Sequence, residues 1–267
     1  MDTSAQANPQ LRKATAERKQ QPGHRCLGRQ RDGNYALSVG VPTGCFNAEQ
    51  LRSLANVIER YGKVGHLSTA QSVIIVGIPA ADFYQAKLAV LDAGFEVRSV
   101  GRDVRQVKCC PGADFSPFGL QSTFPMAEEL ERTFRGLPTP VKFKISVSGC
   151  PNCCANTMLN DFGIHGMVDG WKIFAGGKMG TKPVIAQQIA ESVASDDVAK
   201  YLAAVLRVYE DEAEPKERLA ATLARVGLEQ FTSKVEAALN TPYDDLAQAA
   251  QQAREDANAC ECIGRPD

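Results

Sequence analysis

Nine cysteines in a chain of 267 residues constrain this sequence more than any other feature, because two pairs of them are adjacent: Cys109–Cys110 and Cys153–Cys154. Their odd number argues against a disulfide framework. The polar N-terminal stretch holds no apolar run of the kind that directs export. We therefore expect a cytoplasmic protein, in whose reducing surroundings clustered thiols indicate bound metal.

The charge of the chain narrows the class of partner. A net charge of -1 gives no overall field that would attract nucleic acid or a membrane surface. No segment approaches the length of apolar residues that a membrane-spanning helix needs, which is about 20. We expect neither a nucleic-acid nor a membrane partner, and the sequence is compatible with an oligomer.

Apolar periodicity predicts an α+β fold. Strand-like runs at 35–41, 72–78 and 96–100 alternate with helical patterns, the first of which has Asn47 and Gln50 placed as a capping box. This order is typical of a small sandwich with its helices on one face of the sheet. The rest of the chain predicts strands at 104–108, 142–148 and 171–175, and helices at 127–134, 184–194, 198–212 and, broken near Gly227, 215–239.

The cysteines follow two of these strands. Cys110 comes after the predicted strand at 104–108, and the run Cys150-Pro-Asn-Cys153-Cys154 comes after the strand at 142–148. If Pro151 starts a helical turn, the thiols of Cys150 and Cys154 lie on one face of it. Spacing alone leaves three interpretations open: an iron–sulfur cluster, a zinc site that uses the C-x2-C pair Cys150 and Cys153, or buried inert thiols.

A resemblance to a known family favours the cluster. The stretch KFKISVSGCPNCCANTMLNDFGIHG closely resembles the second cysteine motif of the siroheme sulfite and nitrite reductases. In that family two cysteines with this separation bind a [4Fe-4S] cluster, and the last also bridges to the siroheme iron. The resemblance thus implies that Cys150 is a cluster ligand and that Cys154 is the bridging ligand. Similar segments, including HLSTAQSVIIVGIP and ERLAATLARVGLEQF, extend it from about residue 33 to 235.

The first cysteine motif of the family departs from its pattern here. In VRQVKCCPGADFSPFGL, Cys110 matches the first cysteine, but the second falls on Ser116. The fourth ligand is therefore open: the nearest substitutes are Cys109 and Cys153, and the Ser116 oxygen is a further one. We expect a rearranged four-ligand cluster that uses Cys109 or Cys153.

Basic residues are candidates for the anionic groups of such a site. Taken alone, these residues are typical of a solvated charged edge. They are Arg98, Arg102, Arg105 and Lys108 in one stretch, and Lys142 and Lys144 on one face of a strand. The resemblance implies that Arg105, Lys142 and Lys144 contact siroheme or the substrate anion and supply charge or protons, and we add Arg102 as a candidate for the siroheme carboxylates.

A second departure from the family lies in the segment Ser68-Thr69-Ala70-Gln71, where the family typically reads Thr-Thr-Arg-Gln. The missing arginine helps to hold the bound anion. Losing one charge-assisted contact costs about 1.5–3 kcal/mol, so Ala70 lowers the expected anion affinity or alters the substrate.

These observations predict four segments. They are a flexible N-terminal arm at 1–32, a ferredoxin-like half-domain at 33–102, a siroheme and 4Fe-4S domain with C-terminal helices at 103–240, and a loose polar tail at 241–267. The tail carries Cys260 and Cys262, which are either a redox pair or an incidental exposed pair.

The function that we expect is reduction of a small oxyanion, sulfite or nitrite, at siroheme. No flavin or nicotinamide signature is evident, so an electron-donor protein is the expected partner. Two alternatives stay open. One is a non-catalytic or altered member of the family that serves electron transfer or sensing, and the other is a zinc-stabilised interaction module.

Overall fold

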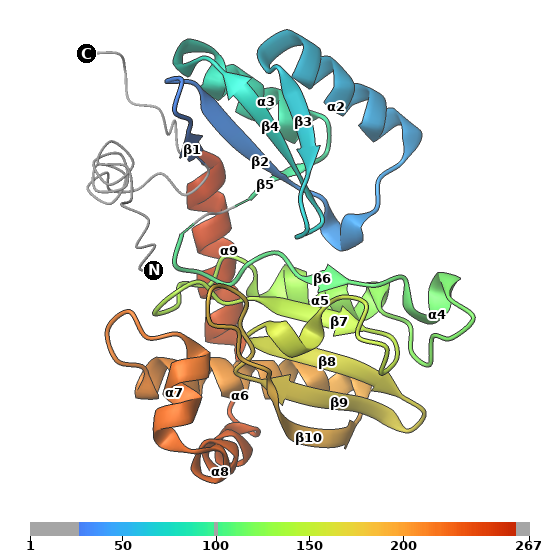
Figure 1. The fold of residues 1–267 in the computed structure, drawn as a ribbon, viewed down its shortest axis with the longest axis vertical. Coiled ribbons are helices and arrows are strands. Elements are labelled where there is room, and N and C mark those ends of the chain that lie inside the picture. Colours follow the sequence, from blue (N-terminus) through green and yellow to red (C-terminus); the bar gives the residue numbers. More distant parts are fainter. Residues whose placement is uncertain (1–26, 99–100, 260–267) are drawn as a thin grey trace, which may run out of the picture.

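The computed structural model describes residues 27–98 and 101–259, which form two units built on separate sheets (Figure 1). Cys260, Cys262 and most of the predicted N-terminal arm lie outside the described residues. No helix of the described part is both long and apolar enough for a membrane span.

The first unit is an antiparallel sheet with two helices. Its strands lie in the order β1-β2-β4-β3, and β5 also pairs with β2. The predicted capping box is present, because Asn47 accepts from the Gln50 N–H and the Gln50 side chain accepts from the Asn47 N–H. The elements are β1 (Leu27–Arg29), β2 (Tyr35–Gly40), η1 (Pro42–Gly44), α2 (Ala48–Tyr61), β3 (Val64–Leu67), β4 (Ser72–Ile78), η2 (Ala80–Asp82), α3 (Phe83–Asp92) and β5 (Glu96–Val97).

The second unit is a mixed sheet in the order β10-β9-β8-β7-β6. β6, β7 and β8 run parallel, whereas β8, β9 and β10 pair antiparallel. The strands are β6 (Lys108–Cys109), β7 (Ile145–Ser148), β8 (Phe162–Met167), β9 (Gly170–Ala175) and β10 (Gln187–Val193). The helices are α4 (Gly112–Phe115), α5 (Phe124–Phe134), η3 (Thr157–Leu159), α6 (Ser195–Glu212), α7 (Leu219–Val226), α8 (Leu228–Ala238) and α9 (Asp244–Ala259).

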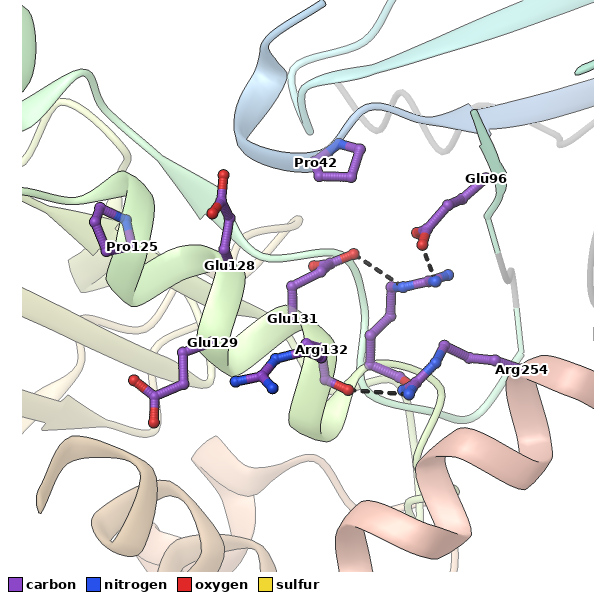
Figure 2. Close-up of a pocket in the computed structure, with 9 residues that line it drawn as sticks. Pro42, Glu96, Pro125, Glu128, Glu129, Glu131, Arg132 and Arg254 are labelled. Carbon is purple, nitrogen blue, oxygen red and sulfur yellow. Dashed lines mark hydrogen bonds and ion pairs between the residues drawn. The ribbon is translucent and has the colours of Figure 1, made fainter. Parts of the chain in front are cut away.

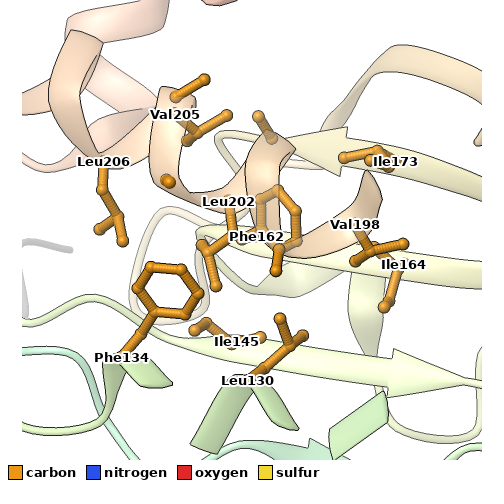
Figure 3. Packing of buried hydrophobic residues seen from close by; sticks show 14 of the residues in the cluster. Leu130, Phe134, Ile145, Phe162, Ile164, Ile173, Val198, Leu202, Val205 and Leu206 are labelled. Atoms are coloured by element: carbon orange, nitrogen blue, oxygen red, sulfur yellow. The ribbon is translucent and has the colours of Figure 1, made fainter. Parts of the chain in front are cut away.

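The alternating residues before the second cysteine motif decide which side chains face the core. The apolar ones are fully buried in it: Phe143, Ile145 and Val147. Figure 3 shows this core closed by Leu130 of α5 and Leu202 of α6. Because neighbouring residues of a strand point to opposite faces, Lys144, Ser146 and Ser148 face away from this core, towards the cysteine turn.

The predicted helix at 184–194 is wrong, because this segment forms β10 at the edge of the sheet. Its pairing with β9 contains two register irregularities. These interrupt the two-residue alternation, so that the buried Ile189 and Val193 lie four residues apart. That spacing is the one that a helix shows in a sequence.

The predicted loose segments at both ends also differ from the structure. Residues of the expected arm form β1, which pairs with β2. In the expected tail, residues 244–259 form α9, whose Leu246 and Ala250 are buried in the second core. Arg254 of this helix donates hydrogen bonds to the carbonyl oxygens of Arg132 and Arg135, so α9 is fixed to α5.

An ionic junction connects the two units on the side of α9 (Figure 2). Arg135 of α5 lies 2.5 Å from Glu96 of β5 and 2.9 Å from Glu131. Glu131 also accepts a hydrogen bond from the Val107 N–H at 2.5 Å. Since Glu96 belongs to the first unit and Glu131 to the second, this junction fixes how the units face each other.

Candidate site at the cysteine turn and the basic cleft

Parallel pairing of β6 with β7 brings the two cysteine motifs together. The register joins Lys108 with Ser146 and Cys109 with Val147, so both strands end at the same edge of the sheet. Cys110 follows the first strand, and Gly149 follows the second. The Gly149 N–H donates to the Cys110 sulfur at 3.2 Å, which places this sulfur beside the residue that precedes Cys150.

The loop after Cys110 folds over Gly149. The N–H groups of Leu120 and Gln121 both donate to the Gly149 carbonyl, at 2.8 and 3.0 Å. A Cβ atom at Gly149 would lie 2.6 Å from the carbonyl oxygen of Gln121 and 2.6 Å from the Cα of Gly112. Only glycine therefore permits this approach of the two segments.

The second cysteine motif forms turns, so the helical turn expected from Pro151 is absent. Cys153 and Asn156 have left-handed φ angles of 60° and 54°, which interrupt a helix. The Ala155 N–H donates to the Ser148 hydroxyl at 3.2 Å and closes the loop upon itself. Within it, Cys154 is exposed to solvent.

Cys109 lies on the opposite side of β6 from Cys110, as strand alternation requires. Its side chain is 2% exposed, and its sulfur lies 3.7 Å from the carbonyl oxygen of Thr43. Burial raises the pKa of this thiol to about 12. Because metal ligation needs the thiolate, Cys109 is poorly suited as the substitute ligand.

The two other candidates for a fourth ligand have local partners. The Cys153 sulfur lies 3.0 Å from the Thr157 hydroxyl, which also contacts His165. The Ser116 hydroxyl accepts from the Phe118 N–H at 3.3 Å. In residues 27–98 and 101–259, no three His, Cys, Asp or Glu side chains lie close enough together to hold one metal ion.

A basic cleft lies where the first unit meets the turn that follows the cysteines. Ala70 and Arg98 line it from the first unit, and Lys108 and Lys144 line it from the second. All lining residues are Thr69, Ala70, Arg98, Gln106, Lys108, Lys144, Ile145, Asn156 and Met179. Asn156 belongs to the same turns as Cys154, so the cleft and the cysteine turn adjoin.

Two glutamines hold the walls of the basic cleft in place. The Gln71 side chain donates to the Cys109 carbonyl at 2.6 Å and accepts from the Cys109 N–H at 2.8 Å. Gln106 donates to the carbonyl oxygens of Val41 and Gln71, at 2.5 and 2.9 Å. These contacts dock the loop that carries Ala70 onto β6.

The cleft concentrates positive charge, although Glu131 and Asp103 act electrostatically on Arg98, and Asp161 on Lys144. Among the described ion pairs, none involves Arg98, Lys108 or Lys144. Burial lowers the pKa of Arg98 to about 10 and also lowers the pKa of both lysines, and the neighbouring cations add to the effect. A buried group of cations of this kind is stabilised by a bound anion.

The remaining predicted basic residues are not among those that line this cleft. Arg102 and Lys142 are exposed. Arg105 is paired with Asp103 at 3.3 Å and donates to the Gly101 carbonyl at 2.5 Å. From the sequence, Arg98 was expected only as part of a charged stretch. Because Val97 is buried and side chains alternate along a strand, the Arg98 side chain points to the opposite side.

Sequence reasoning also missed polar residues around the cleft. Gln106 and Asn156 line it, and Asp161 behind it pairs with Arg218 while accepting from the Lys144 N–H at 2.9 Å. No motif marks these residues, because long-range packing brings them together.

Two protein-family models match this chain. The family described as "Nitrite and sulphite reductase 4Fe-4S domain" matches residues 100–243, and the family "Nitrite/Sulfite reductase ferredoxin-like half domain" matches residues 28–87. A "Nitrite reductase [NAD(P)H]" of Bacillus subtilis is 32% identical over 215 residues, which are 80% of this chain and 26% of the relative.

Two further comparisons concern proteins nearer this chain in size and fold. An assimilatory-type sulfite reductase of Nitratidesulfovibrio vulgaris is 29% identical over 204 residues, covering 75% of this chain and 92% of the relative. The solved structure of Mycobacterium tuberculosis NirA shares the fold, with a TM-score of 0.70 and 23% identity over 83% of this chain and 44% of that one. The chain spans only about a quarter of the NAD(P)H nitrite reductases that it matches.

We predict that Gly149→Ala lowers the free energy of unfolding by about 1–3 kcal/mol, because the added methyl group meets backbone atoms that cannot move aside. The amides of Leu120 and Gln121 should exchange hydrogen faster, since both donate to Gly149. Urea unfolding and hydrogen exchange measure these effects. Gly28→Ala is the control, because its Cβ would meet nothing nearer than 3.7 Å. Equal stability of both variants would contradict the close packing.

Proposed function

The chain belongs to the nitrite and sulfite reductase family with a 4Fe-4S domain and a ferredoxin-like half domain, and on this premise we propose that it reduces sulfite or nitrite with electrons from a partner protein. Siroheme and a [4Fe-4S] cluster are the cofactors of this family. The observation that carries the proposal is the basic cleft, in which Arg98, Lys108 and Lys144 adjoin the cysteine turn.

We propose that thiols at and beside the cysteine turn hold the cluster. Cys110 and Cys150 lie at adjacent strand ends, and Cys154 is exposed on the turn that follows. The hydrogen bond from the Gly149 N–H holds the Cys110 sulfur beside the second cysteine motif. We propose these three residues as ligands, with Cys154 as the bridge to siroheme, and Cys153 or Ser116 in the fourth place. Cys109 is left out, because its sulfur faces the other side of β6.

The basic residues divide between two tasks in this proposal. When bound, siroheme and the cluster supply the electrons and the iron at which the anion is reduced. Lys108 and Lys144 attract the anion into the cleft, and Lys144 holds a proton near it. The flanking Arg102, Arg105 and Lys142 neutralise the carboxylates of the tetrapyrrole.

The electron donor is proposed to be a separate protein. The chain spans about a quarter of the relatives named for NAD(P)H and 43% of a relative from Methanocaldococcus jannaschii named a coenzyme F420-dependent sulfite reductase. The names of these relatives associate the family with more than one kind of reductant.

A second candidate function is supported by Ala70. This residue lines the cleft where the family typically has an arginine. Without that guanidinium, a family member binds its anion less tightly and serves electron transfer or sensing without turnover. Turnover measurements separate the two functions.

We predict that the anaerobically purified protein oxidises a chemically reduced dye when sulfite or nitrite is added. The expected rate depends on the anion, because the cations of the cleft must first bind it. The same mixture without anion is the control, and dye oxidation followed by absorbance is the measurement. No anion-dependent oxidation with either anion would eliminate the reductase and leave the second candidate.

We predict that Cys110→Ala lowers the iron and acid-labile sulfide bound per chain and bleaches the visible absorption, because a cluster ligand is lost. Cys109→Ala is the matched control at the neighbouring position and should keep the iron. Metal analysis of anaerobically purified protein compares the two. Equal iron in both variants, or a colourless wild-type protein with stoichiometric zinc, would refute the ligand assignment.

We predict that nitrite affinity falls as the pH rises through the pKa of Lys144, which burial and nearby cations hold below its ordinary value of 10.5. Nitrite affinity falls with rising pH because only the protonated ammonium of Lys144 attracts the anion. Since the pKa is lowered, this charge is lost at a lower pH than for an ordinary lysine. Charged groups that act on or beside Lys144 are Lys142, Arg218, Asp161, Arg98 and Lys108.

Spectral titration with nitrite measures this affinity, since nitrite keeps its protonation state in the alkaline range. Lys144→Arg is the matched variant, because arginine keeps its charge to higher pH. The fall in affinity should then move to higher pH, and an unchanged profile would show that Lys144 does not govern it.

A further inference from the structure

Arg98 directly follows β5. The loop in which the family has its arginine precedes a different strand, β4. The Arg98 N–H donates to the carbonyl oxygen of Ser38 on β2, directly after the pairing of β5 with β2. From there its guanidinium donates through Nη1 to the Ser72 hydroxyl at 3.0 Å. Ser72 begins β4, two residues after Ala70. The guanidinium thus reaches the start of the strand that follows the Ala70 loop.

The loop itself is intact although its arginine is absent. The Ala70 N–H donates to the Ser68 hydroxyl at 3.2 Å, and the hydroxyls of Ser68 and Ser72 lie 2.7 Å apart. Gln71 clamps the loop to β6. Ala70 therefore lines the cleft in a fixed position, with a side chain too short to contact an anion.

The Arg98 guanidinium still has hydrogen-bonding capacity in the cleft. Its Nε–H is buried and has no hydrogen-bond partner among the residues that the structure describes. No described ion pair involves Arg98, although the carboxylates of Glu131 and Asp103 act on it electrostatically. The cleft also holds the cations Lys108 and Lys144. A buried donor without an acceptor is costly, and an oxyanion in the cleft would satisfy it.

We propose that Arg98, directly after β5, binds the substrate oxyanion in the cleft and supplies the guanidinium that position 70 lacks. This inference rests on the proposed function and names a specificity-determining residue for it. The chemistry recognised is a pair of anionic oxygens, which both a small oxyanion and a tetrapyrrole carboxylate offer. The assignment is to the substrate, because Arg98 shares the cleft with Ala70, where the family places its substrate-binding arginine.

The test compares Arg98→Ala, Arg98→Lys and the double variant Arg98→Ala with Ala70→Arg in the full chain purified with its cofactors. Nitrite is titrated against the visible spectrum of each protein, and extracted siroheme is measured per chain. Arg98→Ala should weaken nitrite binding about ten- to a hundredfold, the effect of one charge-assisted contact. Siroheme content should stay unchanged, and Arg98→Lys should lose less.

The double variant should recover much of the lost affinity, because a guanidinium returns to the cleft from the other wall. Arg52→Ala, an exposed position on α2, is the control and should bind nitrite as the wild type does. Recovery by Ala70→Arg also excludes misfolding as the cause of the loss, since a misfolded cleft would not respond to it.

Three results would overturn the inference. Unchanged nitrite affinity in Arg98→Ala removes the residue from the anion site while leaving the proposed function intact. Loss of siroheme, with normal nitrite affinity in the molecules that keep it, assigns Arg98 to the cofactor carboxylates instead. A wild-type protein whose spectrum responds to neither nitrite nor sulfite overturns the proposed function itself, and this inference with it.

Discussion

The parallel pairing of β6 with β7 is the interaction on which the candidate site depends. Its register places Cys109 beside Val147, and the following residues, Cys110 and Gly149, leave the sheet at one edge. A slip of one residue would turn Cys110 towards the core and Cys109 towards the site, because side chains alternate along a strand. The hydrogen bond from the Gly149 N–H to the Cys110 sulfur and the packing of Gly112 against Gly149 both presuppose this register.

The same sheet lines one side of the basic cleft, and the first unit lines the other side. Lys108 of β6 lines the cleft from the second unit, and Arg98 and the Ala70 loop line it from the first unit. Burying cations together lowers their pKa values and opposes folding. Contacts elsewhere offset this cost, including the Gln71 clamp and the bridge from Arg135 to Glu96 and Glu131. The cleft is thus held open by interactions that lie outside it.

Local pattern in the sequence predicted those parts that local physics determines. The capping box at Asn47 and the alternation that sends Ile145 inwards are present as expected. What the sequence did not predict depends on long-range pairing: the irregular edge strand β10, the docking of α9 and the left-handed conformation at Cys153. For the site, the family resemblance pointed to Cys110 and the lysines, whereas the evidence against Cys109 as the fourth ligand needed the register. The position of Arg98 in the cleft depends on the contact of its guanidinium with Ser72 of β4, which no local pattern predicts.

The two departures from the family pattern differ in what they remove. At Ala70 the loop keeps its backbone, its serine contacts and the Gln71 clamp, so only charge is missing. Charge acts across several ångströms, and a cation on another strand can replace it. At Ser116 the thiol that the family resemblance implies is absent, and the serine hydroxyl accepts from the Phe118 N–H. Ligation acts only at bond length, so replacement there requires a neighbouring side chain or backbone to move. The cleft therefore tolerates its substitution with less rearrangement than the cysteine site does.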